Sequence, residues 1–229
     1  ESTPLDVEVA VDPEMLGKIF EELVTGRHES GSYYTPKPIV AFMCREALKG
    51  HLRDQCPRES ADAIAAFVDT RDARDLRAPE AVLTALREVR ACDPACGSGA
   101  YLLGMLHELV ALRQALFVSQ QLDSRSAYAR KLEIIQHNLY GVDLDPFAVN
   151  IARLRLWLSL IVDFEGETPP PLPNLDFKIE VGDSLTAPAP QQLQPDLFHH
   201  QLVQEYFARK GQFMTAHGPE KRALRDQIA

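Results

Sequence analysis

The sequence predicts an α/β fold in which parallel strands alternate with helices, and three observations support this prediction. Short β-prone segments recur at residues 89–93, 139–144 and 177–181. Apolar residues at helical spacing fill the chain between them, as expected for crossovers between parallel strands. Each segment is also followed by or ends at an acid: Asp93, Asp143 and Asp183. Because ligands bind outside the carboxyl ends of parallel strands, these three acids indicate one binding site.

Length and composition indicate a soluble globular protein. The chain has 229 residues, of which 45% are hydrophobic and 25% are charged. Its net charge of −9 argues against a large DNA-binding surface on this chain alone, because such surfaces neutralise phosphates. No apolar run approaches the roughly 20 residues that span a bilayer, and the N-terminus lacks a secretory pattern. We therefore expect a cytoplasmic protein that does not bind membranes.

The cysteines do not indicate a metal site. Their spacing gives neither a Cys-x-x-Cys pair nor a neighbouring histidine pair, so we expect no bound metal, no disulfide framework, and free buried thiols at all four positions. These are Cys44, Cys56, Cys92 and Cys96.

Residues 1–88 are predicted to form a helical N-terminal segment. Asp12 and Pro13 form a cap followed by proline at the first helical position, which predicts a helix that ends near Gly26. Thr35 and Pro36 repeat this signal and predict a second helix that begins at Thr35. Further helices are expected over residues 60–68 and 79–88.

Residues 89–185 are predicted to form a Rossmann-like half-domain. After the first strand, Gly97 and Gly99 form a turn that permits positive φ and close approach of a ligand to the backbone. Helices are expected over 100–122, 125–138 and 146–161, and the prolines at 169–173 predict a loop. Residues 186–229 are predicted to form a helical extension with a helix over 197–214. The chain starts without Met and stops inside a helix-like segment, so we expect a fragment of a longer protein.

The three acids favour a particular nucleoside ligand. A carboxylate at the tip of the second strand can accept hydrogen bonds from both ribose hydroxyls. A nicotinamide dinucleotide is one candidate. However, the third glycine of the dinucleotide-binding motif is missing here, and the acid of that motif normally lies about 20 residues after the glycine turn. S-Adenosylmethionine, which carries ribose and adenine without a pyrophosphate, suits the pattern better.

Four motifs resemble S-adenosylmethionine-dependent adenine-N6 DNA methyltransferases, including the methylase parts of restriction-modification and phage-defence systems. The segment DPACGSG at residues 93–99 resembles the family's cofactor signature, and GSYYTP at 31–36 resembles its upstream cofactor motif. YGVDLDP at 140–146 is similar to the ribose motif, and GDSL at 182–185 to the adenine-contacting motif. The resemblance spans residues 31–185 and implies a partial class I methyltransferase fold with strands in the order 3-2-1.

The resemblance also implies roles for individual residues. Thr35 and Pro36 would close over the methionine end of the cofactor, and the neighbouring Tyr34 would belong to the same part of the site. The methionyl and sulfonium region would be lined by the residues of the signature, which are Asp93, Pro94, Ala95, Cys96, Gly97 and Gly99. Asp143 would hold the ribose hydroxyls and Leu144 would pack on the adenine. Asp183, with Ser184 beside it, would accept from the adenine amino group.

The family's catalytic tetrapeptide, Asn/Asp/Ser-Pro-Pro-aromatic, is missing from this sequence. That motif holds a target adenine flipped out of the duplex, and residues 168–172 lack both its polar first residue and its aromatic. We therefore assign no catalytic residue to this chain and expect it to be the cofactor-binding part of the enzyme, inactive alone. DNA would be bound through the missing C-terminal part, and an unpaired sheet edge would favour a dimer of the fragment.

Two alternatives remain open at this point. The chain could be a non-catalytic Rossmann-like scaffold that binds a partner through its C-terminal helices. It could also belong to a small-molecule methyltransferase, which the upstream motif at 31–36 disfavours.

Overall fold

The computed structural model describes residues 13–23, 35–164 and 178–186, together with positions 175, 208, 209 and 212. Contacts between Cα atoms divide the chain into Glu1–Ser184 and Leu185–Ala229, and the elements below belong to the first unit. They are α1 (Pro13–Leu23), α3 (Lys37–Gln55), α4 (Ala61–Thr70), α5 (Pro79–Glu88), β1 (Ala91–Asp93), α6 (Ala100–Gln120), α7 (Ala127–His137), β2 (Leu139–Asp143), α8 (Pro146–Ile161) and β3 (Ile179–Val181).

Some sequence predictions fall outside the described residues. These are the Asp12 cap, the placement of Tyr34, the proline-rich loop and most of the helix expected over 197–214. Within that last range, Ala208, Arg209 and Gln212 are helical.

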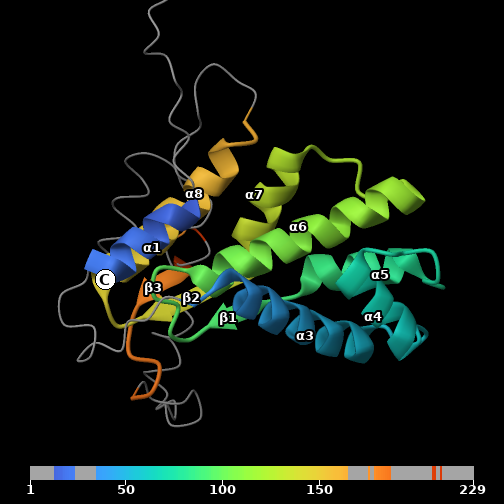
Figure 1. The fold of residues 1–229 in the computed structure, drawn as a ribbon, viewed down its shortest axis with the longest axis horizontal. Coiled ribbons are helices and arrows are strands. Elements are labelled where there is room, and N and C mark those ends of the chain that lie inside the picture. Colours follow the sequence, from blue (N-terminus) through green and yellow to red (C-terminus); the bar gives the residue numbers. More distant parts are fainter. Residues whose placement is uncertain are drawn as a thin grey trace, which may run out of the picture. The chain divides into compact units, whose positions relative to one another are not determined.

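The three strands form a parallel sheet in the order β1-β2-β3 (Figure 1). This confirms the α/β class and the predicted order 3-2-1. In the register, Asp93 pairs with Gly141, and Asp143 pairs with Val181. Asp143 therefore lies two residues farther along the sheet than Asp93, and Asp183 lies two residues past the end of β3.

The crossover helices α6, α7 and α8 contact one another and the strands, so they cover one face of the sheet. The core between them consists of large aliphatic side chains that are almost completely buried, including Leu106, Leu109, Leu139, Leu156 and Ile179. On the other side of α6, α3 and α5 pack against it, and α4 packs on α3 (Figure 1). Helix α1 lies along α8.

Helix α6 corrects one expectation from the sequence. It is long and apolar enough to cross a membrane by length and composition, although we expected no apolar segment near that length. Half of its most apolar window is buried inside the protein, and it carries Glu108 and Arg113 into buried ion pairs. These are the properties of the central helix of a folded core.

Helix starts follow local capping chemistry where a side chain reaches an amide. Ser60, Ser126 and Asp145 each accept a hydrogen bond from the first turn of the helix that follows. The expected start at Thr35 was wrong, because α3 begins at Lys37 with Pro36 as its N-cap and no capping side chain. Pro38 explains this start, since proline suits the first turn, where a backbone N–H has no helical partner.

Candidate cofactor site

The glycine turn between β1 and α6 has the left-handed backbone that its sequence predicts. Gly97 has φ of 52° and Gly99 has φ of 86°. A Cβ added to Gly97 would meet nothing within 4 Å, whereas one added to Gly99 would lie 2.9 Å from Cβ of Ala152 in α8. Gly97 is therefore open on the outer side of the turn, and Gly99 rests against α8.

Asp143 joins the glycine turn to the tip of β2. Its Oδ2 accepts from the backbone N–H of Gly97 at 2.7 Å, and its Oδ1 accepts from that of Asp145 at 3.0 Å. The backbone N–H of Cys96 also donates to the carbonyl of Val142 at 2.9 Å. A carboxylate offers about four acceptor positions, so these two bonds leave room for a pair of ligand hydroxyls.

The segment after β3 reaches the same edge of the sheet. The N–H of Gly182 donates to the carbonyl of Asp143 at 2.9 Å, and Oγ of Ser184 donates to the carbonyl of Pro94 at 2.7 Å. Both chain neighbours of Asp183 are thus tied to the tips of the other strands. The two-residue offset between neighbouring acids, about 7 Å of strand, suits an extended ligand that crosses the tips obliquely.

Asp93 is the most unusual group at this edge. Its Oδ1 accepts from the N–H of Ala95 at 3.1 Å, but its Oδ2 is buried and has no hydrogen-bond partner among the described residues. Burial raises the pKa of the Asp93 carboxyl, the Ala95 N–H opposes this rise, and the nearby charge of Asp143 adds to it. A cation placed at Oδ2 would stabilise the ionised carboxylate and so lower its pKa again.

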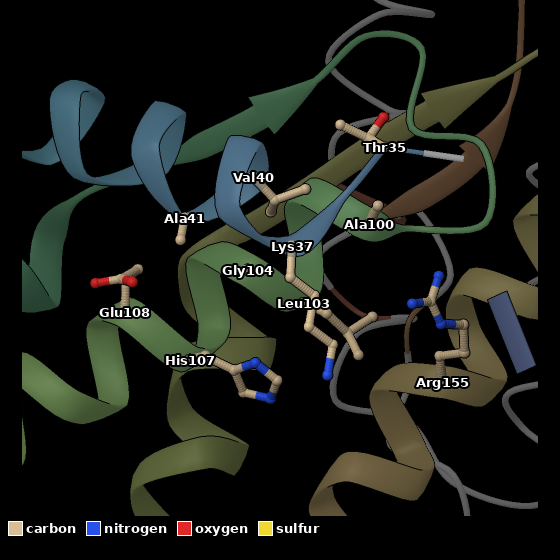
Figure 2. A pocket seen from close by; sticks show the side chains of 10 residues that line it. All are labelled: Thr35, Lys37, Val40, Ala41, Ala100, Leu103, Gly104, His107, Glu108 and Arg155. Carbon is tan, nitrogen blue, oxygen red and sulfur yellow. The ribbon is translucent and has the colours of Figure 1, made fainter. Parts of the chain in front are cut away.

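Two cavities flank the turn. One of about 200 Å³ lies between α3, α6 and α8, and Thr35 and Ala100 line it next to the glycine turn (Figure 2). Figure 2 also shows the nitrogen-bearing side chains of Lys37, His107 and Arg155 along this cavity. The other, of about 290 Å³, lies at β1, and its lining includes Asp93 and Pro94.

Family comparisons identify the class of protein. A family model described as "MmeI, DNA-methyltransferase domain" matches residues 69–167, and one described as "Eco57I restriction-modification methylase" matches residues 137–224. The chain is therefore similar, over residues 69–224, to methyltransferases of restriction-modification systems.

Curated relatives of the chain have names of the same kind. A Methanocaldococcus jannaschii protein named as a type II restriction enzyme and methyltransferase is 33% identical over 199 residues, covering 78% of this chain and 17% of the relative. DNA methyltransferase A of Bacillus subtilis is 24% identical over 65% of the chain and 16% of its own length. The adenine-specific methyltransferase PglX of Streptomyces coelicolor is 31% identical over 46% of the chain and 8% of its own length. The chain therefore matches less than a fifth of each of these proteins.

A solved structure is also similar to the chain. It is the Type IIL restriction-modification enzyme MmeI in complex with DNA, with a TM-score of 0.47 and 17% identity, over 80% of this chain and 24% of that one.

The structure clarifies the cysteines, one of which lies in the candidate cofactor site. Cys96 is buried, and burial raises the pKa of its thiol to about 12, with the charges of Asp93 and Asp143 adding to the rise. A buried thiol with a raised pKa stays protonated at neutral pH, which suits packing better than nucleophilic attack. Cys44 and Cys56 are also buried, but the expectation was wrong for Cys92, which is exposed on β1, an edge strand of the sheet that the described residues form.

Gly141 is a packing position of the site whose importance the sequence did not reveal. A Cβ at this residue of β2 would lie 2.9 Å from Cδ1 of Leu102 and 3.0 Å from Sγ of Cys96. Gly141 therefore lets the glycine turn and the start of α6 pack directly on β2. Only the pairing of two segments about 40 residues apart shows this requirement.

The structure brings together most, but not all, of the predicted site residues. Hydrogen bonds connect the segments that carry Asp93 to Gly97, Asp143 and Ser184. Leu144 is 72% exposed, and Asp183 is exposed in its loop. Pro36 caps α3 next to Thr35, in the segment that borders the first cavity.

Proposed function

We propose that this chain is the S-adenosylmethionine-binding part of a DNA methyltransferase that acts on the N6 atom of adenine. The observation that supports it best is the convergence of the three strand tips, where Asp143 bonds to the glycine turn and Asp93 holds a buried oxygen without a protein partner among the described residues. Adenine specificity is supported by the name of the PglX relative and by the four sequence motifs.

The residues present fit this cofactor. The buried Oδ2 of Asp93 suits the methionyl ammonium, whose charge would offset the desolvation of the carboxylate. The open outer side of Gly97 leaves space for the ligand along the backbone. Asp143 keeps acceptor capacity for the ribose hydroxyls, and the exposed Leu144 offers apolar surface to the adenine.

Bound S-adenosylmethionine would supply an electrophilic methyl group on its sulfonium. This chain would bind and orient the cofactor through its backbone turn and its acids. The group that positions the target adenine would come from another part of the complete protein, because the tetrapeptide motif does not occur in these 229 residues.

Calorimetric titration of the chain with S-adenosylmethionine tests the binding role. We expect Asp143→Ala to weaken binding by about 10–100-fold, since it removes charge-assisted bonds to the ribose. Asp54→Asn is the charge-matched control, because Asp54 is exposed on α3 away from the strand tips. Circular dichroism establishes that each variant is folded.

Two results would count against this proposal. If the folded chain shows no binding at millimolar cofactor, the cofactor role is wrong. If Asp143→Ala binds as tightly as the unmodified chain, Asp143 does not hold the ribose. Transfer of labelled methyl groups to DNA by the complete protein, followed by nucleoside analysis, distinguishes adenine N6 from cytosine as the acceptor.

A further inference from the structure

The glycine turn is held from the side of α8 as well as from the strand tips. Arg155 of α8, which is 3% exposed, donates from Nη1 to the carbonyl of Ser98 at 2.7 Å and to its Oγ at 2.9 Å. Ser98 lies between the two left-handed glycines and is 1% exposed. Arg155 therefore fixes the peptide group that joins Ser98 to Gly99, in the middle of the turn.

The same guanidinium group binds the N-terminal helix. Its Nε donates to the carbonyl of Pro13, the first residue of α1, at 2.6 Å. Gly17, one turn farther along α1, is buried, and a Cβ added there would overlap the guanidinium of Arg155. Figure 1 shows α1 lying along α8, so the glycine lets this helix pack directly over the arginine.

The chemistry of arginine connects these two contacts. Nε and Nη1 belong to one rigid planar group, so a shift of α1 that displaces Nε also displaces the donor to Ser98. Lysine has a single nitrogen on a flexible stem and lacks this fork geometry. A displacement of α1 would therefore be transmitted to the peptide group that joins Ser98 to Gly99.

We propose that Arg155 is a positioning residue that couples the docking of α1 to the shape of the glycine turn, and through it to affinity for the methyl donor. The affinity part rests on the proposed function above, while the effect on the turn does not. The N-terminal helix is thereby a regulatory element for the cofactor site, although its first residue, Pro13, lies 84 residues before Gly97 in the sequence.

Gly17→Ala tests the coupling, because its methyl group displaces the guanidinium without touching the turn. Gly50→Ala is the matched control, since it makes the same change within α3 where a Cβ meets nothing within 4 Å. We expect Gly17→Ala to speed amide hydrogen exchange at both 13–23 and 96–99 and to weaken S-adenosylmethionine binding about fivefold or more. Gly50→Ala should change neither exchange rate and should alter the affinity by less than about twofold.

Arg155→Lys is the second variant and keeps the charge at this position. It should reproduce the faster exchange at 96–99, which a role confined to charge would not produce. Faster exchange at 13–23 with unchanged exchange at 96–99 in Gly17→Ala would overturn the coupling. If the unmodified chain fails to bind S-adenosylmethionine, the proposed function fails, and the exchange data at 96–99 still decide whether α1 and the turn are coupled.

Discussion

At the scale of single residues, the ionised carboxylate of Asp93 destabilises the fold but is the form that would bind a cationic ligand. Its carboxylate is half-buried beside Asp143, and one oxygen has no partner among the described residues. A carboxyl whose pKa is raised in the folded state favours its neutral form there. The ionised group therefore destabilises the fold above that pKa, and the penalty disappears at acidic pH.

Asp93→Asn should separate these two effects. At pH 7 the variant should gain about 0.5–1 kcal/mol in its free energy of unfolding, because it removes a buried charge, and this gain should vanish near pH 3. The same change should weaken S-adenosylmethionine binding, and the unmodified chain should lose affinity as falling pH protonates Asp93. Urea unfolding at several pH values and calorimetry measure both quantities. A variant that is less stable at pH 7 would contradict the assigned penalty.

The two glycines of the turn should respond differently to alanine. The methyl group added by Gly97→Ala meets no atom within 4 Å. The positive φ alone should therefore lower the free energy of unfolding, by about 1–2 kcal/mol. Gly99→Ala has the same unfavourable positive φ and also places its methyl group against Cβ of Ala152, so it should destabilise the chain more. Adding Ala152→Gly to Gly99→Ala should recover part of the loss. Thermal unfolding of the three variants measures the order, and equal losses at the two glycines would refute it.

At the scale of elements, a buried ion-pair network joins α5, α6 and α7. Asp123, in the loop between α6 and α7, accepts from Arg113 Nε at 2.6 Å and from Arg125 Nε at 3.0 Å. Arg87 of α5 reaches the same carboxylate at 3.2 Å. Burial would raise the pKa of Asp123, but the hydrogen bonds and charges of Arg113 and Arg125 outweigh it and lower that pKa to about 2.

Asp123→Asn should therefore destabilise the chain by about 3 kcal/mol at pH 7, since it removes the fully buried one of the two carboxylates that pair with Arg113 and leaves only Glu133. A lowered pKa means that the ionised carboxylate stabilises the fold fully above about pH 4 and less as pH falls toward 2. The difference between variant and unmodified chain should shrink over that range. Urea unfolding at pH 7, 4 and 2.5 measures it, with Asp54→Asn as the exposed control. A difference that stays constant with pH would exclude this role for Asp123.

At the scale of the whole molecule, β1 is an edge strand of the described sheet. It pairs with β2 on one side and has no other strand beside it among the described residues. Cys92 is exposed on this strand, next to a cavity that Met43 and Met105 also line. Exposed edge strands with apolar neighbours pair with other chains.

We therefore predict that this chain self-associates as its concentration rises, and that Cys92→Lys reduces the association by adding charge to the edge. Light scattering over a concentration series, with reducing agent present to prevent disulfides, measures this. A mass equal to the monomer at every concentration would rule out pairing through β1.

Local patterns in the sequence were sufficient for most helices and strands. The expected helix at 79–88 has the observed bounds, and Asp145 caps α8 as its position before Pro146 indicates. Thr35 was the exception, because Pro38 moved the start of α3 along the chain. The site was only partly predictable from the sequence. The residues of each motif could be named, but the hydrogen bonds between the motifs depend on the register of the strands.

Local sequence patterns were enough to predict the class of fold, the glycine turn and the three acids, because periodicity, capping and glycine conformation act over a few residues. The tertiary structure alone decided that Gly141 must lack a side chain, that Oδ2 of Asp93 is buried, and that Arg155 connects α1 to the turn. These properties arise from packing between segments that are distant in the sequence, and no local pattern encodes them.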